Sequence, residues 1–279
     1  MKNNFVKIFA VLVTSLSIFC AGCFQGESNL TIDDNGKVTL KNELMGVPLM
    51  RDAIEGFKND MERSNFVTEI EPIASGNLSG YRITTQYATI EQFAAQEIEV
   101  FGRTSKSKGI QQRKGWFFDA YNFDFISEAP EDSETYLDNP IVQSMMPQIK
   151  FDMVINLPYA AEKNNAHNSS NEGKTLSWNL TSSITSGKNV PIQVQFKVWH
   201  KSKIALTFAA FIMLLCSTVY FFQKAKNYSE DAEEAIRYIK YMQICAGMTA
   251  AIVSASVFML ISPVEFTDAD IISPLISGK

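Results

Sequence analysis

Two long apolar runs without a charged side chain constrain this chain more than any other feature. They occupy residues 204–222 and 244–262, and each contains 19 residues. A helix rises 1.5 Å per residue, so about 20 apolar residues cross the hydrocarbon core of a bilayer. No globular sequence surrounds the second run, which argues against a buried helix of a soluble domain. We therefore predict two transmembrane helices.

Small residues recur at four-residue spacing in the second run. They are Gly247, Ala251 and Ala255. Such a stripe lets two membrane helices approach closely. We expect its partner to be the 204–222 helix or a second copy of the protein.

Charged residues around the two runs predict their orientation. Four basic residues lie in 223–243, whereas 263–279 holds three acids and only Lys279. Short loops rich in lysine and arginine stay in the cytoplasm, so we expect 223–243 inside and the acidic tail outside. Three lysines just before the first run oppose this assignment mildly, and export of the preceding segment outweighs them. The basic residues of the two groups are Lys224, Lys226, Arg237 and Lys240, and Lys197, Lys201 and Lys203.

The stretch 223–243 has the pattern of an amphipathic helix. Asn227 is followed by Glu230 at capping-box spacing, and Glu233 lies four residues before Arg237. We expect this helix to begin at Asn227 and to run into the second apolar run.

Residues 1–22 are typical of a bacterial signal peptide. Lys2 and Lys7 give a basic start, and the apolar run 8–19 is too short to span a bilayer. A segment of this kind directs the downstream chain out of the cytoplasm.

The end of this segment resembles a lipobox. Ala21 and Gly22 precede Cys23, and small residues there admit the backbone into the cleft of a lipoprotein signal peptidase. Cys20 stands where leucine is usual. We expect the mature chain to begin at a lipid-modified Cys23. An ordinary signal peptide cut nearby, or an uncleaved anchor, is the alternative.

Composition limits what the exported segment can be. The 279-residue chain has a formal net charge of −5, whereas nucleic-acid-binding domains normally carry a basic excess. No cysteine occurs between Cys23 and Cys216, which excludes a disulfide framework there. The domain must be held together by its hydrophobic core.

The first half of the exported segment alternates strand pairs with helices. We predict a hairpin over 29–44 that turns at Asp34-Asn35-Gly36, and strands over 65–73 and 80–88. A helix follows each strand pair, the second one capped by Thr89 and Gln92. The expected strand pairs are Leu30 with Leu40 and Ile32 with Val38. The expected inner faces are Leu49, Met50, Ala53, Ile54, Phe57 and Met61, then Ile90, Phe93, Ala94, Ile98 and Phe101.

The second half is mostly strands. A hairpin turns at Lys114-Gly115, with Phe117, Tyr121, Phe123 and Phe125 on one side, and a long loop covers 127–148. Three alternating strands follow, and the last ends so close to the first apolar run that the domain must sit against the bilayer. These strands are 149–158, 174–180 and 191–200.

We therefore predict an α+β exported domain of antiparallel strands with two covering helices. The predicted parts are a signal peptide (1–22), the exported domain (23–203), a transmembrane helix (204–222), a cytoplasmic connector (223–243), a second transmembrane helix (244–262) and an acidic tail (263–279).

Several of these segments together resemble the LppM-like bacterial lipoproteins. The resemblance rests on the cysteine, the "LTIDDNGKVTL" hairpin and the stretch "INLPYAAEKNNAHNSSNEGKTLSWNL" before a membrane helix. Within that stretch the marks are Leu157-Pro158, Asn165-Ala166, Gly173 and Trp178. Tyr159 stands where glycine is usual, and a second membrane helix departs from the pattern. The resemblance implies a partly barrel-like domain, a role in the envelope, lipid binding and no known enzymatic activity.

The sequence offers no catalytic constellation. HExxH, GxSxG and Walker motifs are absent from it, and neither His167 nor His200 has an evident nucleophile or ligand partner. The acids between 128 and 138 lack the spacing of a calcium loop. We expect a non-enzymatic protein without cofactor or metal.

One stretch combines basic and aromatic residues. The segment 102–118 contains no acid and ends in three aromatic residues, a composition suited to anionic lipid headgroups. The alternative is a sheet edge whose lysines prevent strand pairing and whose rings belong to the core. The candidate lipid contacts are Arg103, Lys106, Lys108, Arg113, Lys114 and Trp116.

Two classes of function stay open. One is a lipid- or glycolipid-binding envelope protein at the outer face of the cytoplasmic membrane. The other is a structural protein that docks a membrane-protein partner, or a second copy of itself, through its domain or helices. An apolar cavity would favour the first class, and a flat exposed apolar patch the second.

Overall fold

The computed structural model describes residues 24–62, 66–95, 98–100, 103–105, 109–127, 149–181, 189–228, 232–267 and 270. The chain divides into two compact units, one formed by 1–111, 121–196 and 268–279 and the other by 112–120 and 197–267. We call the first the α+β unit and the second the helix-pair unit. The predicted signal peptide, Cys23 and residues 128–148 of the predicted loop lie outside the described residues.

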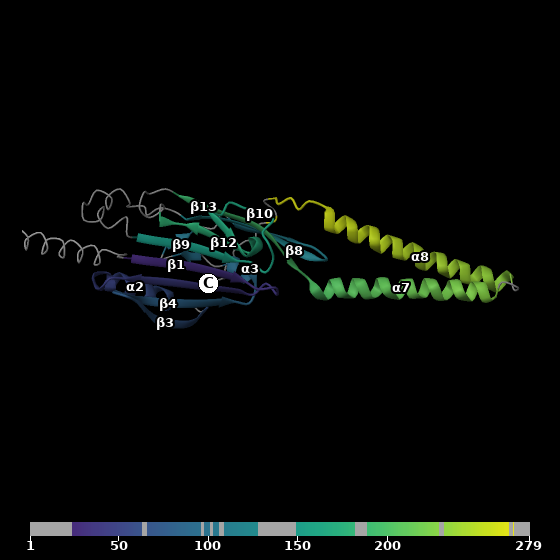
Figure 1. Cartoon of the computed structure of the whole chain (residues 1–279), viewed down its shortest axis with the longest axis horizontal. Helices are drawn as coiled ribbons and strands as arrows, with labels where there is room; N and C mark the ends of the chain where they lie inside the picture. The colour runs from purple at the N-terminus through teal and green to yellow at the C-terminus, as the bar shows by residue number, and fades with distance from the viewer. Residues whose placement is uncertain are drawn as a thin grey trace, which may run out of the picture. The chain divides into compact units, whose positions relative to one another are not determined.

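Seven strands form the larger sheet, in the order β11-β12-β9-β1-β2-β4-β3 (Figure 1). Neighbouring strands are antiparallel except β1 and β9, which run parallel. Parallel neighbours need a long crossover connection, and here β2 to β8 intervene along the chain. The strands are β1 (Phe24–Ile32), β2 (Val38–Gly46), β3 (Val67–Ser75), β4 (Leu78–Tyr87), β9 (Ile149–Asn156), β11 (Asn168–Ser170) and β12 (Thr175–Asn179); the 3-10 turn η3 (Asn171–Gly173) joins the last two.

The predicted first hairpin is confirmed. The Asp33 carboxylate accepts hydrogen bonds from the backbone amides of Asn35 and Lys37, each at 2.9 Å. Gly36 has φ of 82°, a left-handed conformation that glycine adopts without steric cost. The buried pairs across the hairpin are those expected, Leu30 opposite Leu40 and Ile32 opposite Val38.

Four strands form a second sheet in the order β10-β13-β8-β7, and β5 and β6 form a separate pair. In the part of the chain that the structure describes, these sheets are open and none closes into a barrel. The strands of the predicted hairpin at Lys114-Gly115 and the predicted strand 191–200 are therefore present. The bounds are β5 (Ile98–Val100), β6 (Arg103–Ser105), β7 (Gly109–Lys114), β8 (Phe118–Ser127), β10 (Lys163–Asn164) and β13 (Val190–Trp199).

Aromatic side chains form a central part of the core of the α+β unit. Phe123 on β8 is fully buried, and its ring centroid lies 5.0 Å from that of Phe196, 5.3 Å from Phe125 and 6.3 Å from Phe93. Tilted and edge-on ring pairs at such distances add to the free energy gained by burial. One side chain thus joins β8 and β13 to the short helix that carries Phe93.

Asn165 connects the two main sheets. Its Oδ1 accepts hydrogen bonds from the Trp178 indole on β12, at 2.9 Å, and from the Gln193 amide on β13, at 2.8 Å. Its Nδ2 donates to the carbonyl oxygen of Pro191 at 3.0 Å. The asparagine and tryptophan of the sequence motif therefore have a structural role.

The first predicted helix begins later than expected. Pro48–Met50 form a 3-10 turn (η1), and α2 (Arg51–Glu62) follows it. Ile54, Phe57 and Met61 are buried as predicted, but Leu49 is 82% exposed and Ala53 is exposed as well. Residues in a 3-10 turn advance by three per turn, so Leu49 falls outside the inner face of α2.

The second predicted helix is much shorter than expected. α3 (Ile90–Ala94) is capped by Thr89, whose Oγ1 accepts the Gln92 amide at 3.1 Å, while Gln92 Oε1 accepts the amide of Ala88. The cap is confirmed, but the helix predicted to extend through Phe101 is wrong at 98–100, which form β5. Isoleucine and valine there favour an extended chain because they are branched at Cβ.

Two long helices contain the two apolar runs. They are α7 (Lys201–Asn227) and α8 (Ala232–Ile261), and both are long and apolar enough to cross a membrane by length and composition. The buried share of the apolar window is 0% in α7 and 6% in α8. Apolar helices with so little burial are compatible with a membrane-associated protein.

The stretch between the runs differs from the prediction. Asn227 is the last residue of α7 rather than the cap of a new helix, and the Tyr228 amide donates to the Lys224 carbonyl at 3.1 Å. Lys224 and Lys226 lie in the last turn of α7, where cations favour the helix dipole. The amphipathic stretch therefore extends both helices, and its expected continuation into the second run is confirmed.

The small-residue stripe does not face α7. Gly247, Ala251 and Ala255 are exposed, and a Cβ on Gly247 would meet nothing within 4 Å. Of the two expected partners of this stripe, the 204–222 helix is therefore contradicted, because another side of α8 faces α7, and a second copy of the protein stays a prediction. The half-buried residues on that side are Met242, Cys245, Thr249, Ile252 and Ser256.

Candidate functional site: the junction of the β7–β8 hairpin with the long helices

The turn of the β7–β8 hairpin belongs to the helix-pair unit. It follows Lys114, and the Gly115 amide donates to Asp119 Oδ1 at 3.2 Å. A Cβ on Gly115 would lie 2.5 Å from the Phe118 carbonyl oxygen, so only glycine fits without movement. The predicted turn at Lys114-Gly115 is confirmed.

An apolar cluster forms beside this turn. Side chains alternate between the two faces of a strand, so Phe118 and Ala120 lie on the face of β8 opposite to the core residues Phe123 and Phe125. The Phe118 ring lies 5.1 Å from that of Trp199 on β13, and Val264 and Phe266 from the segment after α8 pack on the cluster. The chain beyond α8 therefore covers the hairpin.

Polar contacts tie the start of α7 to the hairpin. The His200 amide donates to the Phe117 carbonyl at 2.8 Å, and His200 Nε2 lies 3.1 Å from Asp119 Oδ1. In the second turn of α7, Thr207 Oγ1 accepts a hydrogen bond from the Trp116 indole at 3.1 Å. Both the backbone and the side chains of the hairpin therefore hold the first two turns of α7.

A further contact ties the segment after α8 to the same hairpin. Arg113 Nη1 donates to the carbonyl oxygen of Glu265 at 2.8 Å. We call residues 263–267, which carry this contact and the two apolar ones, the strap. Because the guanidinium bonds a neutral carbonyl, its positive charge is not paired within this contact.

Lysines lie over the aromatic rings of the junction. Lys197 Nζ is 4.4 Å from the centroid of the Phe118 ring, and Lys203 Nζ is 5.7 Å from that of Trp116. Trp116 is 50% exposed, with its N–H bonded to a threonine. A cation is attracted to the face of an aromatic ring, and the lysines and rings here together form a belt of positive charges and aromatic side chains.

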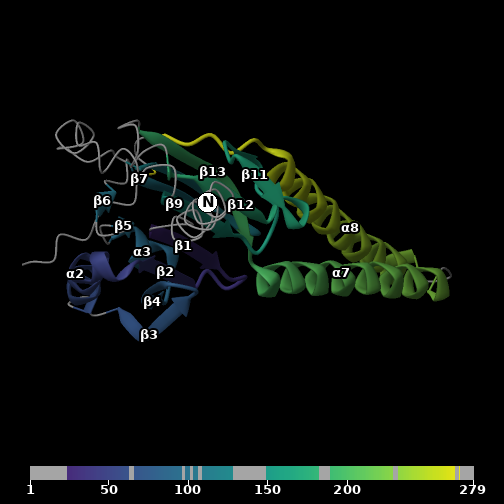
Figure 2. The same cartoon turned by 60° about the vertical axis from the view of Figure 1, so that its left-hand side comes forward.

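A cleft opens between α7 and α8. Both views show the two helices close at their connecting loop and diverging toward the opposite end (Figures 1 and 2). The cleft has a volume of about 440 Å³; Phe211 of α7 and Ile252, Ser256 and Val257 of α8 line it, together with Phe117 and Trp199. We call it the interhelix cleft.

The predicted lipid contacts fall partly inside this junction. Arg113, Lys114 and Trp116 belong to the helix-pair unit, whereas Arg103 lies on β6 of the α+β unit. Lys106 and Lys108 lie outside the described residues, as does Cys23. The structure thus brings Arg113 and Trp116 to the long helices, and the lipid-binding role of all six residues stays a prediction.

Sequence reasoning missed other members of the junction. It identifies Trp199 only as a strand residue and Lys203 only as one of the lysines that oppose the topology. Val264 and Phe266 appear in it only as part of the acidic tail. A tryptophan and lysines immediately before an apolar run are a readable sign of a membrane interface. The packing of the strap had no local signal, because hydrophobic pattern does not identify a partner far along the chain.

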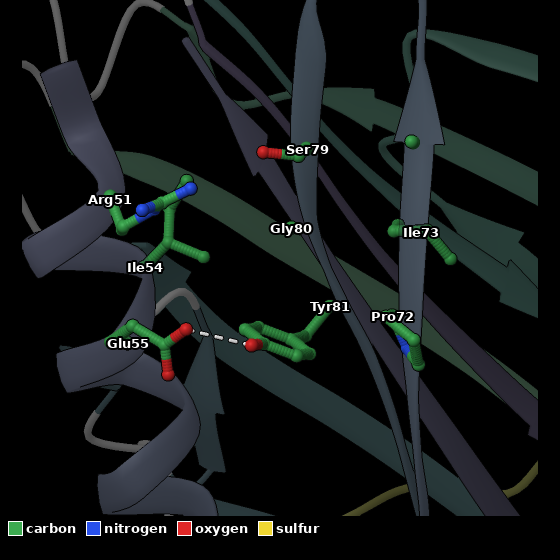
Figure 3. Close-up of a pocket in the computed structure, with 9 residues that line it drawn as sticks. Arg51, Ile54, Glu55, Pro72, Ile73, Ser79, Gly80 and Tyr81 are labelled. Atoms are coloured by element: carbon green, nitrogen blue, oxygen red, sulfur yellow. Dashed lines mark hydrogen bonds between the residues drawn. The ribbon is translucent and has the colours of Figure 1, made fainter. Parts of the chain in front are cut away.

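A second cavity lies in the α+β unit, between α2, β3 and β4. It measures about 420 Å³, and Figure 3 shows Tyr81 pointing at Glu55 across it. The phenol donates to Glu55 Oε1 at 2.7 Å, and this hydrogen bond, followed by desolvation, raises the pKa of Tyr81. Lys58 lies over the same ring at 5.2 Å, and its hydrogen bond to Glu62 raises the pKa of the lysine. No sequence motif marks these residues as a group.

A network of charges on three neighbouring strands stabilises the larger sheet. Arg82 on β4 donates to Glu43 at 2.6 Å and to Glu71 at 3.2 Å, and the hydrogen bond to Glu43 is the main reason that the pKa of Arg82 is raised. The three residues come from adjacent strands, β2, β4 and β3, and are partly exposed. We assign this network to strand pairing rather than to chemistry.

The histidines have structural partners. His167 Nδ1 accepts the Asn179 amide at 3.0 Å, and His200 pairs with Asp119 at the start of α7. Among the residues that the structure describes, no group of three His, Cys, Asp or Glu side chains is placed to hold a metal ion. The acidic stretch at 128–138 lies outside them.

Comparison with known proteins gives one distant likeness. No family model and no curated protein matches the chain. Among solved structures, it is similar to the folded domain of the LppM protein of Mycobacterium tuberculosis, determined by NMR. The two share 12% identity with a TM-score of 0.40, over 66% of this chain and 94% of that one. Membership of the LppM-like family, which the sequence suggests, is not shown by a likeness of this size.

Proposed function

We propose that this protein is a membrane-anchored envelope lipoprotein without enzymatic activity. In this proposal α7 and α8 cross the cytoplasmic membrane, and the α+β unit lies on its outer side. The observation that carries it is the strap: Glu265, just after α8, and His200, just before α7, both bond the β7–β8 hairpin. The two outer helix ends therefore lie on one side of the proposed membrane.

The charges at the other end of the helix pair agree with this topology. Lys224 and Lys226 end α7, and Arg237 and Lys240 lie in the first turns of α8. Short basic loops remain in the cytoplasm. Three aromatic contacts, of which the shortest joins Phe221 and Tyr241 at 5.5 Å, hold the helices together there.

The junction at the outer end has the composition of an interfacial belt. Tryptophan rings, one with its N–H bonded, lysines over ring faces and an arginine bonded to a carbonyl gather where the uncharged run begins. Tryptophan prefers the headgroup level of a bilayer, and basic residues there attract anionic lipids. We therefore propose that Arg113, Lys114 and Trp116 contact anionic headgroups.

A second candidate is assembly through α8. The exposed stripe of Gly247, Ala251 and Ala255 lies away from α7, and small residues at this spacing allow a close helix crossing. A second copy or another membrane protein would then pack on that side. This function is compatible with the first one, since the stripe and the junction use different residues.

Site-directed labelling tests the topology. Single cysteines replacing Ser229, between the helices, and Thr267, in the strap, are exposed to an impermeant thiol reagent in right-side-out and in inverted membrane vesicles. Cys216 and Cys245 are first replaced by serine. We expect Thr267→Cys to react only in right-side-out vesicles and Ser229→Cys only in inverted ones. The opposite pattern would reverse the orientation, and reaction of both in both preparations would exclude a spanning pair.

The lipid anchor has its own test. Cys23→Ser should leave the signal peptide uncleaved and remove the lipid, because the lipoprotein signal peptidase needs a modified thiol. The mass of the purified chain measures both effects. An unchanged N-terminus after this substitution would exclude lipidation at Cys23, and α7 and α8 should hold the variant in the membrane.

A further inference from the structure

The lining of the interhelix cleft is too apolar to hold ordered water. Its lining is apolar except for the indole of Trp199 and the hydroxyl groups of Thr207 and Ser256, and that of Thr207 already bonds the Lys203 carbonyl oxygen and the Trp116 indole. Apolar cavities stay dry, and a water molecule needs two to four polar partners. A cavity of about 440 Å³ lies within the range of ligand-binding pockets. Something apolar must fill the cleft.

The position of the cleft along α7 suggests what fills it. Phe211 lies eight residues beyond Lys203, which is about 12 Å along the helix. One leaflet of a bilayer has a hydrocarbon layer of about 15 Å, half of the total. The cleft therefore reaches through most of one leaflet, beginning at the proposed interface, and it has the depth of a lipid chain rather than of a headgroup.

Charge at the mouth of the cleft indicates the headgroup. Lys203 lies in the first turn of α7, directly above Thr207, and Arg113 lies on the neighbouring hairpin. Basic residues outnumber acids in 112–120, 197–204 and 262–267 together. The basic ones are Arg113, Lys114, Lys197, Lys201 and Lys203, and the acids are Asp119 and Glu265. A negative phosphate is the complementary partner.

We propose that the interhelix cleft binds one acyl chain of an anionic phospholipid from the outer leaflet, with its phosphate beside Lys203. This inference rests on the proposed membrane topology and deepens it, because it assigns one lipid to one site. The lipid separates α7 from α8 where they diverge, and it takes the place of side chains that would otherwise have to close the gap.

Native mass spectrometry of the full chain tests the site. The protein is purified in mild detergent from a bacterial membrane that contains phosphatidylglycerol and phosphatidylethanolamine. We expect one retained phosphatidylglycerol per chain. Ser256→Phe fills the cleft and should lower this retention at least tenfold. Ser254→Phe is the matched control, because it makes the same serine-to-phenylalanine change at an exposed residue on another side of α8.

A third variant tests the headgroup. Lys203→Gln should lower the preference for phosphatidylglycerol over phosphatidylethanolamine about fivefold, the effect of one basic residue near an anionic surface. The total of one retained lipid should stay the same. An unchanged preference in Lys203→Gln, with one lipid still retained, would assign the binding to the acyl chain alone and overturn the role of the phosphate.

The remaining outcomes also decide. Equal retention by Ser256→Phe and Ser254→Phe, or a lipid-free dimer of the unchanged protein, would overturn the proposal. If Ser256→Phe loses its helical circular dichroism signal, a second experiment replaces this variant. It measures the quenching of tryptophan fluorescence by phosphatidylglycerol that is brominated along its acyl chains. The unchanged protein should then be quenched more than Trp199→Phe, and equal quenching would overturn the site. Release of the protein by alkaline carbonate would instead overturn the membrane topology itself.

Discussion

The two units use the same apolar residues in opposite ways. In the α+β unit the rings of Phe123 and Phe196 are 0% and 1% exposed, whereas Phe208 of α7 and Phe258 of α8 are 62% and 75% exposed. Leu30 of the α+β unit is likewise 0% exposed, whereas Leu206 of α7 is 63% exposed. Burial of apolar surface drives folding in water. The buried core of the α+β unit therefore accounts for its stability in water, whereas the helix pair leaves its apolar surface exposed. The exposed apolar surface of the helix pair is compatible with a membrane-associated protein.

The largest expected effect separates the two kinds of phenylalanine. Phe123→Ala should cost about 3–5 kcal/mol of unfolding free energy, because it opens a cavity at the centre of the core. Phe258→Ala should change it by less than about 0.5 kcal/mol. Denaturant unfolding of the full chain in detergent, followed by near-UV circular dichroism, measures both. Equal costs would mean that the helix pair has a packed core of its own.

Two exposed leucines sharpen the comparison. Leu215 is 42% exposed on α7, and Leu49 is 82% exposed on η1 of the α+β unit. Leu215→Lys should cost about 2.5–3.5 kcal/mol of insertion free energy at the centre of a membrane helix. Leu49→Lys should be nearly neutral, because its side chain already faces solvent. The fraction that resists carbonate extraction reports the first variant and the unfolding midpoint the second; full insertion of Leu215→Lys would argue against a spanning α7.

Basic residues allow the same comparison with lipid as the probe. Arg113→Gln with Lys114→Gln should weaken the association of phosphatidylglycerol with the protein by about 2 kcal/mol, or about thirtyfold, at about 1 kcal/mol per charge. Lys37→Gln with Lys41→Gln, at exposed positions of the β1–β2 hairpin, should leave it unchanged. Spin-labelled phosphatidylglycerol in reconstituted membranes measures the association. High salt should remove the difference, because screening shortens the field to about 8 Å even at physiological strength.

The smallest effect is a pH dependence confined to the α+β unit. The pKa of Tyr81 is raised in the folded state, so its protonated form is favoured there. Its contribution to stability is complete below the pKa of an unfolded tyrosine, near 10, and is lost as the pH rises through the higher folded value. Tyr81→Phe should flatten the fall of stability in alkaline solution, as measured by denaturant midpoints between about pH 8 and 11. An unchanged slope would show that the hydrogen bond to Glu55 does not carry this dependence.

Local patterns predict most of the elements, and the errors have local causes too. The sequence predicts the turn of the first hairpin from Gly36, whose positive φ is confirmed, whereas the capping bonds of the Asp33 carboxylate were not predicted. The pattern misplaces Leu49 because a proline-initiated 3-10 turn precedes α2. It predicts helix at 98–100 because a helical spacing of apolar side chains continues past α3, where strand propensity prevails.

The candidate site could be predicted only in part. A basic-aromatic turn and an uncharged run are each visible in the sequence, and so is the interface they imply. Their meeting through Trp116 and Thr207 is not visible, nor is the bond between Arg113 and Glu265, because such contacts depend on the return of the chain through two helices. The interhelix cleft also had no local signal, since it depends on the angle between α7 and α8.

The strap has a consequence for the order in which the protein is made. Glu265 follows its partner Arg113 by 152 residues. At about 5–20 residues per second, a ribosome needs roughly 8 to 30 s to make the chain between them. Throughout that interval the face of Phe118 and Ala120 has no cover from Val264 and Phe266. The strap can therefore close only after both long helices have been made, and a chain cut short before Val264 would leave the apolar face of Phe118 and Ala120 without this cover.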